Sequence, residues 1–213
     1  MSEIYNTIKS QCKDHCELLV VSKTRSVDQI RSYYDLGVRD FGENRAQELI
    51  EKAAQLPCDI HWQFIGHLQR NKVRSVLPYL SRICSLDSVE LASVIEKEAA
   101  RLNRKIGVLI EFNVAEESTK TGLDPKQADS FLSALKEFPH LVVEGIMVMG
   151  PHVDDRQAIA RSFHQSRILF DHLRSLSDPE QFRICSMGMS HDYQEALQEG
   201  STQLRIGTIL FQE

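Results

Sequence analysis

The sequence predicts an α/β protein folded as one (β/α)8 barrel of the TIM type, a single domain that spans residues 1–213. Short apolar runs rich in Val, Ile and Leu alternate with amphipathic helical segments, and this pattern occurs eight times along the chain. Parallel strands need crossover helices, and eight such strands can close into a barrel without an exposed edge. No linker, repeat or low-complexity segment divides the chain. The rival fold, an open doubly wound sheet, is disfavoured because no Gly-x-Gly-x-x-Gly motif follows the first strand.

The first half of the chain contains four strand and helix units. Ser26 is a typical N-cap for the first helix, and Gly37 is a typical stop signal after it. Pro57 ends the second helix, because the residue before a proline disfavours helical backbone. The predicted strands are 18–22, 38–41, 60–65 and 82–86, and the helices that follow them are 27–36, 46–56, 73–76 and 88–102.

The second half contains the other four units. Asp124 and Pro125 suit the cap and the first position of a helix, and Gly200 suits the end of the last one. The predicted strands are 106–114, 141–149, 182–186 and 203–206. A helix that begins at Asp124 follows the first of them, and helices 155–176 and 192–198 follow the second and the third.

The composition disfavours several classes of protein. The 42% hydrophobic content suffices for a large core, whereas the net charge of -5 and the scattered Lys and Arg provide no basic surface for nucleic acid. No segment approaches the roughly 20 apolar residues of a membrane helix, and residues 1–6 do not resemble a secretion signal. We therefore expect a soluble, cytoplasmic protein that binds neither nucleic acid nor membrane.

The cysteines predict neither a disulfide framework nor a metal site. Their number, five, is odd and their spacing is irregular, which favours reduced thiols. Cys12, His15 and Cys16 form one local cluster, but a distant pair of ligands is lacking. We therefore expect no bound metal.

Lys23 is the leading candidate for a functional residue. It directly follows the run 18–22, where the first strand should end, and α/β barrels keep their chemistry at the carboxyl ends of their strands. The alternative is a lysine in a solvated loop, where most lysines are found. Two later segments favour the functional interpretation.

These two segments, 186–192 and 205–208, predict a binding site for a phosphate group. The first contributes two hydroxyls and a glycine before a helix whose N-terminus attracts anions. The second lies at the eighth strand, and barrels often bind phosphate after strands seven and eight. Each segment alone could be a capping serine or a glycine turn. Together with Lys23, they predict a phosphorylated aldehyde that condenses with the lysine amine.

Condensation with an aldehyde also makes a prediction about the surroundings of Lys23. The attacking amine must be neutral, and burial disfavours the ammonium form. We therefore expect Lys23 to be largely buried.

Six segments together resemble one protein family. They are Val21-Ser22-Lys23-Thr24, Phe41-Gly42-Glu43-Asn44, Phe64-Ile65-Gly66-His67-Leu68-Gln69 with Asn71-Lys72, Ser118-Thr119-Lys120-Thr121-Gly122, Ser186-Met187-Gly188-Met189-Ser190 and Arg205-Ile206-Gly207-Thr208. The chain resembles the pyridoxal phosphate homeostasis proteins over nearly its whole length. The resemblance implies a monomeric fold-type III barrel, related to the alanine racemase N-terminal domain, that carries pyridoxal 5′-phosphate (PLP). It also implies no established catalysis, and a role in holding the cofactor or delivering it to apo-enzymes, and so in vitamin B6 homeostasis.

The resemblance assigns roles to eight residues. Lys23 would form the Schiff base, Arg205 would face the ring nitrogen, and Asn44 would lie beside the cofactor. The phosphate would be held by Ser186, Gly207 and Thr208, with help from Met189 and Ser190. Glu43 and Arg45 flank Asn44, and the alternative to a place beside the cofactor is that they belong to a solvated turn. The other methionines near strand ends are interpreted as core residues: Met147, Met149 and Met187.

Arg205 bears on the chemistry of such a site. A guanidinium stays protonated and can only donate hydrogen bonds, so beside a pyridine nitrogen it leaves that nitrogen unprotonated. The ring is then a poor electron sink, which favours limited chemistry or simple carriage. The alternative for Arg205 is an exposed or ion-paired side chain.

Four features depart from the family pattern. Gln63 stands where relatives often have a histidine, Arg45 where an aromatic residue is common, and His191 where a small or acidic residue is usual. The fourth is the ending 211–213, in place of a glycine and a further tail. We expect these departures to affect the outer packing and the loop geometry more than cofactor binding.

Three functions remain open. An amino-acid racemase needs an acid and a base on opposite faces of the substrate α-carbon, and Lys23 is only one of them. In the racemases that the chain resembles, the second group comes from an additional domain, which we do not expect here. A non-enzymatic cofactor carrier is therefore favoured, with the racemase as the alternative, and a binding module without cofactor would be colourless. We also expect segment 116–120 to be a mobile loop at the barrel mouth.

Overall fold

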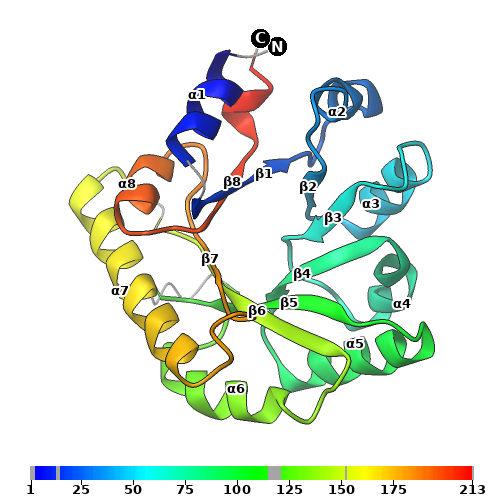
Figure 1. Cartoon of the computed structure of the whole chain (residues 1–213), viewed down its shortest axis with the longest axis vertical. Coiled ribbons are helices and arrows are strands. Elements are labelled where there is room, and N and C mark those ends of the chain that lie inside the picture. Colours follow the sequence, from blue (N-terminus) through cyan, green and yellow to red (C-terminus); the bar gives the residue numbers. More distant parts are fainter. Residues whose placement is uncertain (1–2, 13–14, 115–120, 152, 213) are drawn as a thin grey trace.

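The computed structural model describes residues 3–12, 15–114, 121–151 and 153–212. Eight parallel strands form a closed barrel in chain order, and the eighth pairs with the first, so the predicted fold is confirmed (Figure 1). The predicted loop at 116–120 lies outside the described residues. The strands are β1 (Glu17–Val21), β2 (Asp40–Glu43), β3 (His61–Phe64), β4 (Leu80–Leu86), β5 (Ile106–Phe112), β6 (Leu141–Val148), β7 (Ile184–Ser186) and β8 (Gln203–Ile206).

Helices cover the outside of the barrel (Figure 1). The predicted caps are present: the Ser26 hydroxyl accepts a hydrogen bond from the Gln29 backbone N–H, and the Asp124 carboxylate accepts one from the Lys126 backbone N–H. The α-helices are α1 (Glu3–Cys12), α2 (Val27–Tyr34), α3 (Ala46–Ala53), α4 (Val73–Val76), α5 (Val89–Arg101), α6 (Ala128–Leu135), α7 (Arg156–Ser175) and α8 (Tyr193–Gln198). The short 3-10 helices are η2 (Arg70–Lys72), η3 (Leu77–Tyr79), η4 (Pro125–Gln127) and η5 (Thr208–Leu210).

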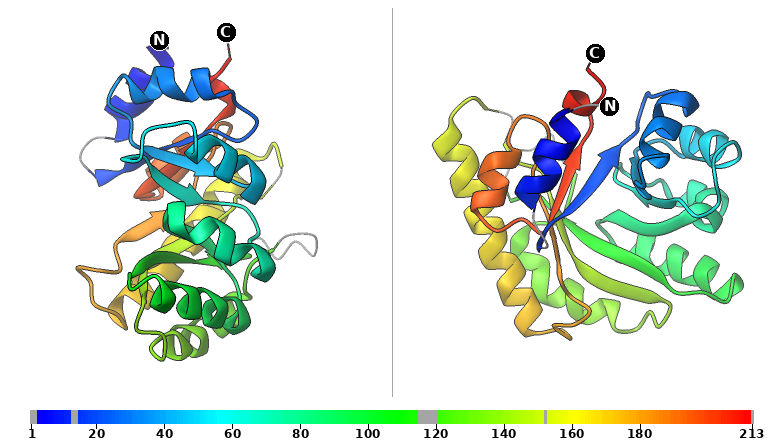
Figure 2. Two further views of the ribbon diagram at one scale, coloured as in Figure 1. Left: turned by 90° about the vertical axis from the view of Figure 1, so that its right-hand side faces the viewer. Right: turned by 45° about the horizontal axis from the view of Figure 1, so that its top comes forward.

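Helix α1 is absent from the prediction. It packs against β1 and η5, so the two ends of the chain lie side by side (Figure 2). The ring of Tyr5 meets the ring of Tyr33 edge-on, with 5.7 Å between the centroids. Ile8 and Cys12 are the buried residues of this helix. With Ile4 they are spaced four residues apart, so a short helical pattern was present in the sequence.

Strand β7 is shorter than the predicted segment 182–186. Phe182 lies before the strand, and its ring stacks on Phe170 of α7 with 5.5 Å between the centroids. The pairing of β7 with β8 consists of Ser186 opposite Gln203. The apolar character of Phe182 therefore reflects helix packing rather than membership of the strand.

The core has two layers, because side chains on successive strand residues alternate between the barrel interior and the helices. The larger layer lies between strands and helices and contains most of the buried apolar residues. A small apolar cluster from four neighbouring strands is packed separately and consists of Cys84, Leu109, Met147 and Ile184.

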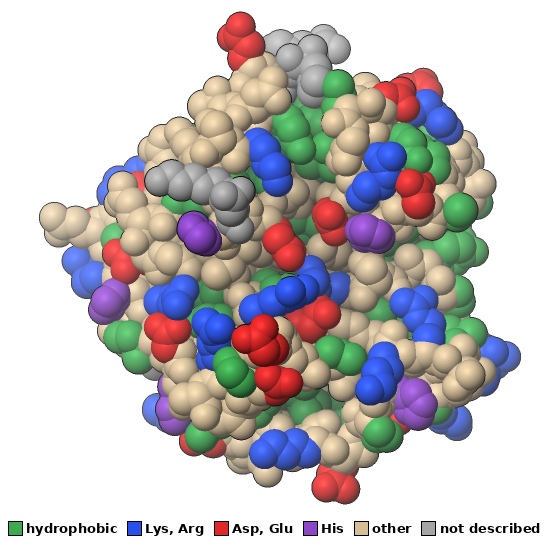
Figure 3. Space-filling model, in the orientation of Figure 1, with side chains coloured by type: hydrophobic (Ala, Val, Ile, Leu, Met, Phe, Trp, Pro, Cys, Tyr) green, Lys and Arg blue, Asp and Glu red, His purple; other side chains and the backbone are tan. Residues whose placement is uncertain are grey.

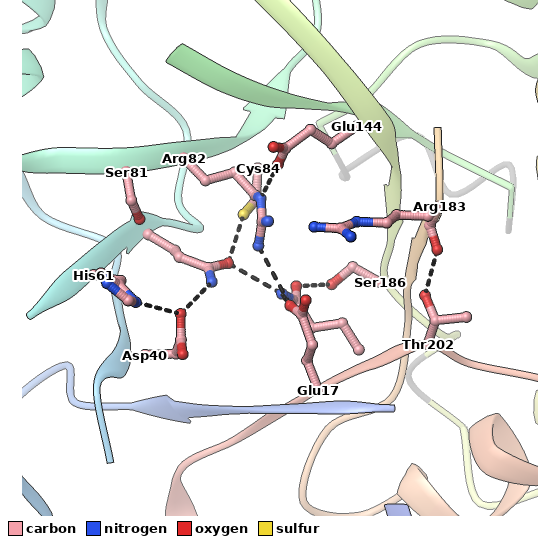
Figure 4. A network of polar contacts seen from close by, with 12 residues as sticks. Glu17, Asp40, His61, Ser81, Arg82, Cys84, Glu144, Arg183, Ser186 and Thr202 are labelled. Carbon is pink, nitrogen blue, oxygen red and sulfur yellow. Dashed lines mark hydrogen bonds and ion pairs between the residues drawn. The ribbon is translucent and has the colours of Figure 1, made fainter. Parts of the chain in front are cut away.

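A polar network accompanies this small cluster (Figure 4). Arg82 of β4 pairs with Glu17 of β1 and with Glu144 of β6. The side-chain amide nitrogen of Gln203 donates to Glu17 at 3.0 Å, and its oxygen accepts from the Ser186 hydroxyl at 2.7 Å. Polar contacts therefore extend from the start of β1 to the end of β7.

Gln63 belongs to the same network. Its side-chain oxygen accepts from the amide of Gln203 at 3.1 Å, and its side chain is 1% exposed. The expectation that this departure affects the outer packing is wrong, because Gln63 is enclosed in the polar network that links β1, β3 and β8. Arg45 and His191, two of the other departures, are exposed.

The surface mixes charges of both signs. Lys, Arg, Asp and Glu side chains lie next to one another on the face shown in Figure 3. Among the residues that the structure describes, no helix is long and apolar enough to span a membrane. Within the same ranges, no group of three or more His, Cys, Asp or Glu side chains could hold a metal ion.

A substitution at Gly145 of β6 would test how closely β6 and β7 are packed. The φ of this glycine is +150°, and a Cβ there would overlap the carbonyl oxygen of Ile184 on β7. We expect Gly145→Ala to lower the free energy of unfolding by more than about 3 kcal/mol, because Gly145 and Ile184 are paired between β6 and β7 and the carbonyl cannot move aside. Gly37→Ala is the matched control, since its φ is +92° and nothing lies within 4 Å, which leaves about 1 kcal/mol of backbone strain. Urea unfolding measures both, and equal losses would contradict the prediction.

Candidate functional site

A cavity of about 400 Å³ opens at the carboxyl ends of the strands. Seven of the eight residues predicted from the sequence line it, and the eighth, Ser186, does not. The lining residues are Val21, Lys23, Thr24, Arg25, Asn44, Ile65, Gly66, His67, Glu111, Thr121, Met147, Met149, Met189, Ser190, His191, Arg205, Gly207 and Thr208.

Lys23 lies two residues after the end of β1. Strand alternation places it on the same side as Val21, and both side chains line the cavity. Lys23 is exposed, so the expectation of a largely buried amine is wrong. The reason is that the cavity opens to solvent where β1 ends. Among the described residues, none forms a hydrogen bond or ion pair with its amine.

Asn44 follows β2 and also lines the cavity. Its side-chain oxygen is buried, and no group in the described ranges donates a hydrogen bond to it. A buried carbonyl oxygen without a donor is costly, so this atom is suited to a ligand that donates a hydrogen bond.

Glu43, next to Asn44, does not lie in a solvated turn. It is 0% exposed, and its Oε1 accepts from the Ser22 hydroxyl at 2.6 Å and from the Lys52 amine at 2.7 Å. Burial raises the pKa of Glu43, and the hydrogen bonds from Lys52 and Ser22 oppose this effect. The solvated-turn alternative holds only for the exposed Arg45.

Arg205 points from β8 into the cavity and is 4% exposed. One terminal nitrogen donates to the backbone oxygen and the hydroxyl of Ser186, both at 2.8 Å, and the other donates to the Val148 oxygen at 2.7 Å. Burial lowers the pKa of the guanidinium. The alternative of an exposed or ion-paired arginine is therefore wrong, because Arg205 is buried and bonded to neutral oxygens of β6 and β7.

Ser186 has a different place from the one expected. It is fully buried outside the cavity wall, and its hydroxyl donates to Gln203 and accepts from Arg205. Both contacts hold the hydroxyl away from a ligand in the cavity. Ser186 thus supports Arg205, and its role as a direct phosphate ligand stays a prediction.

The other predicted phosphate residues lie together where β7 and β8 end. The backbone N–H of Met189 already donates to the carboxylate of Asp192, so Ser190, Gly207 and Thr208 are the better-placed groups. A Cβ on Gly207 would lie 3.0 Å from the Val21 backbone oxygen. Glycine therefore lets this turn pack closely against the end of β1.

Glu111 of β5 is a cavity residue that the sequence reasoning missed. It is 2% exposed, and its Oε1 accepts from the Thr121 hydroxyl at 2.7 Å. Burial raises its pKa, and the bond from Thr121 opposes this effect. A single charged residue inside the apolar run 106–112 was the available signal.

The methionines divide between core and cavity. Met187 is fully buried in the core and lies outside the cavity wall, in agreement with its interpretation as a core residue. Met147 is 1% exposed and belongs to the small apolar cluster, so its interpretation as a core residue is confirmed, although it also borders the cavity. Met149 lines the cavity as well and is half-buried. Both come from the end of β6, where inward-facing side chains reach the mouth of the barrel.

The raised pKa of Glu111 predicts a pH-dependent stability. A carboxyl group whose pKa is higher in the folded state stabilises the fold at low pH, and this contribution is lost as the pH rises through the folded pKa. Glu111→Gln keeps an acceptor for Thr121 without the charge. We expect the variant to be more stable than the wild type at about pH 8, by about 1 kcal/mol or roughly 2–4 °C, with the difference vanishing near about pH 4.

Thermal unfolding across this pH range measures the difference between the two proteins. The exposed Glu90→Gln is the matched control and should change the midpoint little at any pH. A variant that is less stable than the wild type at neutral pH would show that the Glu111 charge is stabilised in the fold.

Comparison with known proteins identifies the family. The family model described as alanine racemase, N-terminal domain, matches residues 2–213. The pyridoxal phosphate homeostasis protein of Aquifex aeolicus is 36% identical over 224 residues, which cover 100% of this chain and 96% of the relative.

Solved structures agree with these matches. PipY of Synechococcus elongatus, solved without PLP, has a TM-score of 0.92 at 33% identity, with 99% of each chain covered. The PipY structure with PLP bound has a TM-score of 0.90 at the same identity and coverage. An alanine racemase of Clostridium difficile, at 16% identity and a TM-score of 0.82, covers 98% of this chain and 55% of its own length and shares the fold. This chain, a member of the alanine racemase N-terminal domain family, belongs to the pyridoxal phosphate homeostasis proteins.

Proposed function

We propose that this protein binds pyridoxal 5′-phosphate as a Schiff base on Lys23 and takes part in intracellular vitamin B6 homeostasis without catalysis. The observation that carries the proposal is that the Lys23 amine, the Arg205 guanidinium and the turn 207–208 line one cavity. The family supports it, and so does the relative PipY, which has been solved with PLP bound.

The residues of the cavity fit this cofactor. When bound, the cofactor would supply an aldehyde, and the Lys23 amine would hold it through a C=N bond, with the carbonyl oxygen released as water. Ser190, Gly207 and Thr208 are suited to the phosphate because the turns after β7 and β8 offer hydroxyl and backbone donors to the same cavity. The buried oxygen of Asn44 offers an acceptor for a donor on the cofactor or on a neighbouring loop.

Arg205 suits carriage rather than catalysis. Its guanidinium has five N–H groups and uses three on Ser186 and Val148, so two remain for a ligand. A guanidinium facing the ring nitrogen would leave that nitrogen unprotonated, which weakens the ring as an electron sink. The protein then holds the aldehyde without activating it strongly.

The alternative function is an amino-acid racemase of the alanine type. It requires a second proton-transfer group on the face of the substrate opposite Lys23. Glu111 is a buried carboxyl group in the same cavity wall, and it is the observation that keeps this alternative open. We favour the carrier because Arg205 disfavours the carbanion that racemisation needs.

The proposal extends to the setting of the protein. We propose a cytoplasmic monomer that releases its cofactor to PLP-dependent apo-enzymes. The open cavity supports the release of the cofactor, because the amine of Lys23 is exposed and reachable from solvent.

Borohydride reduction tests the linkage to Lys23. Wild-type protein incubated with PLP should gain the mass of one reduced pyridoxyl phosphate group, whereas Lys23→Ala should gain none, because it lacks the amine. The exposed Lys97→Ala is the matched control and should label like the wild type. Intact-mass spectrometry measures all three proteins.

Three outcomes would contradict the proposal, two of this experiment and one of a chiral assay on the loaded protein. Labelling of Lys23→Ala at the wild-type level would place the linkage elsewhere. Formation of D-alanine from L-alanine by the loaded protein, at ordinary enzyme turnover, would favour the racemase. A colourless wild type that gains no mass would support a binding module without cofactor.

Thr208 tests the phosphate site. Thr208→Val removes a hydroxyl and keeps the shape, so we expect the apparent dissociation constant for PLP to rise about tenfold, as for one hydrogen bond to a charged group. Pyridoxal, which lacks the phosphate, should bind both proteins equally. Ser186→Ala should leave the preference for PLP over pyridoxal unchanged, because Ser186 lies outside the cavity wall. Titration followed by absorbance measures these constants, and an equal effect of Thr208→Val on both ligands would contradict the assignment.

A further inference from the structure

We propose that Glu43, Glu48 and Lys52 form a clamp that positions Lys23 for reaction with the cofactor aldehyde. The inference rests on the proposed function and assigns positioning roles to three residues outside the cavity wall. The term clamp is used below for these three residues.

Lys52 of α3 is the centre of the clamp. It is 7% exposed, which is unusual for a lysine. Its amine donates to the Ser22 backbone oxygen at 2.8 Å, to Glu43 Oε1 at 2.7 Å and to Glu48 Oε2 at 3.0 Å. All three protons of the ammonium group are therefore used in one small region at the end of β1.

The clamp holds the backbone on both sides of Lys23. On one side, the Ser22 backbone oxygen binds Lys52, and the Ser22 hydroxyl donates to Glu43 Oε1 at 2.6 Å. On the other side, the Thr24 backbone N–H donates to Glu48 Oε2 at 2.9 Å. The Lys23 side chain has no such contact among the described residues. Its direction is therefore set by the two residues next to it.

The backbone at Thr24 requires such support. Its φ is +63°, a left-handed conformation that a β-branched residue rarely adopts. Strained conformations persist where the surrounding contacts determine them, and they concentrate at functional sites. The bond from Thr24 to Glu48 is therefore a contact that fixes the turn through which Lys23 leaves β1.

The charges of the clamp point to positioning rather than to general stability. Burial raises the pKa of Glu43 against its bonds to Lys52 and Ser22, and its Oε2 has no hydrogen-bond donor within the described part of the chain. For Glu48, burial acts in the same direction, but the bonds from Thr24 and Lys52 outweigh it and lower the pKa. Apolar side chains would fill this space at less cost, and buried ion pairs are often retained for specificity.

The clamp lies on the other side of the strands from the cavity. Glu43 alternates along β2 with Gly42 and Asn44, and Asn44 lines the cavity. The clamp therefore also fixes the strand end that carries Asn44. A reacting amine must be held within a narrow range of positions. Groups that fix the backbone next to the amine, on the side away from the cavity, meet this requirement.

Glu48→Ala tests the clamp with little risk to folding. The Glu48 side chain is only partly buried, and alanine is the best helix former for α3. We expect the rate of borohydride-trapped labelling of Lys23 by PLP to fall and the apparent dissociation constant to rise, each by about tenfold, because small displacements of a reacting group are costly. Hydrogen exchange at the Thr24 amide should become faster, because its acceptor is removed.

Two further variants separate positioning from a merely structural role. Glu48→Gln keeps an oxygen that can accept from Thr24, so it should retain most of the labelling rate. Glu51→Ala is the matched control, because Glu51 lies on the same helix and is exposed, with its carboxylate bonded to Gln47. It should label like the wild type.

The outcomes separate this inference from the proposed function. If the wild type labels at Lys23 and Glu48→Ala labels at the same rate and affinity, the clamp is overturned and the proposed function stands. Slow labelling in both Glu48→Ala and Glu51→Ala would also overturn it, because the effect would then belong to the helix. A wild type that gains no label would overturn the proposed function and the clamp together.

Discussion

The pairing of β1 with β8 is the contact on which the rest of the structure depends. It joins residues at opposite ends of the chain, with Glu17 opposite Gln203 and Leu19 opposite Arg205. Because the strands are parallel, both reach the same rim, so Lys23 and Thr208 line one cavity. The close packing of the turn after β8 against the end of β1 requires Gly207, since a Cβ there would press on Val21. Closure of the barrel and assembly of the site are thus one event, and it depends on strands separated by almost the whole chain.

The polar interior of the barrel determines the floor of this site. Arg205 is held by neutral oxygens, one of which is the Ser186 hydroxyl. This hydroxyl donates a hydrogen bond to the Gln203 side chain, which in turn donates one to Gln63. Such a network is costly unless each member is satisfied, but when satisfied it fixes a single arrangement. The guanidinium is therefore set in place by the fold, before a ligand arrives. The same network explains how Gln63 is accommodated at its position.

The parts of the molecule that follow from local pattern could be predicted, and the parts that depend on packing could not. The apolar runs predicted where the strands end, and these ends placed Lys23 and Arg205 at the same rim of the barrel, where the strands have their carboxyl ends. Strand alternation does not tell whether a hydroxyl meets a ligand or a neighbour, so the contacts of Ser186 with Gln203 and Arg205 could not be predicted. Exposure depends on the shape of the whole mouth, so the exposed Lys23 was expected to be buried. Glu111 was missed although the apolar run around it was a local signal of burial, because strand alternation alone does not show that its side chain borders the cavity.

Two supports act on the site from opposite sides of the barrel wall. The network inside the wall holds Arg205, and the clamp outside it holds the backbone around Lys23. Neither support closes over the amine, which is exposed at the mouth. A catalyst gains from enclosing its reactants, because water weakens the electrostatic effects on which it depends. The proposed role as a carrier instead needs groups that are fixed in direction and still open to exchange, and the side chains at the ends of β1, β2 and β8 meet both requirements.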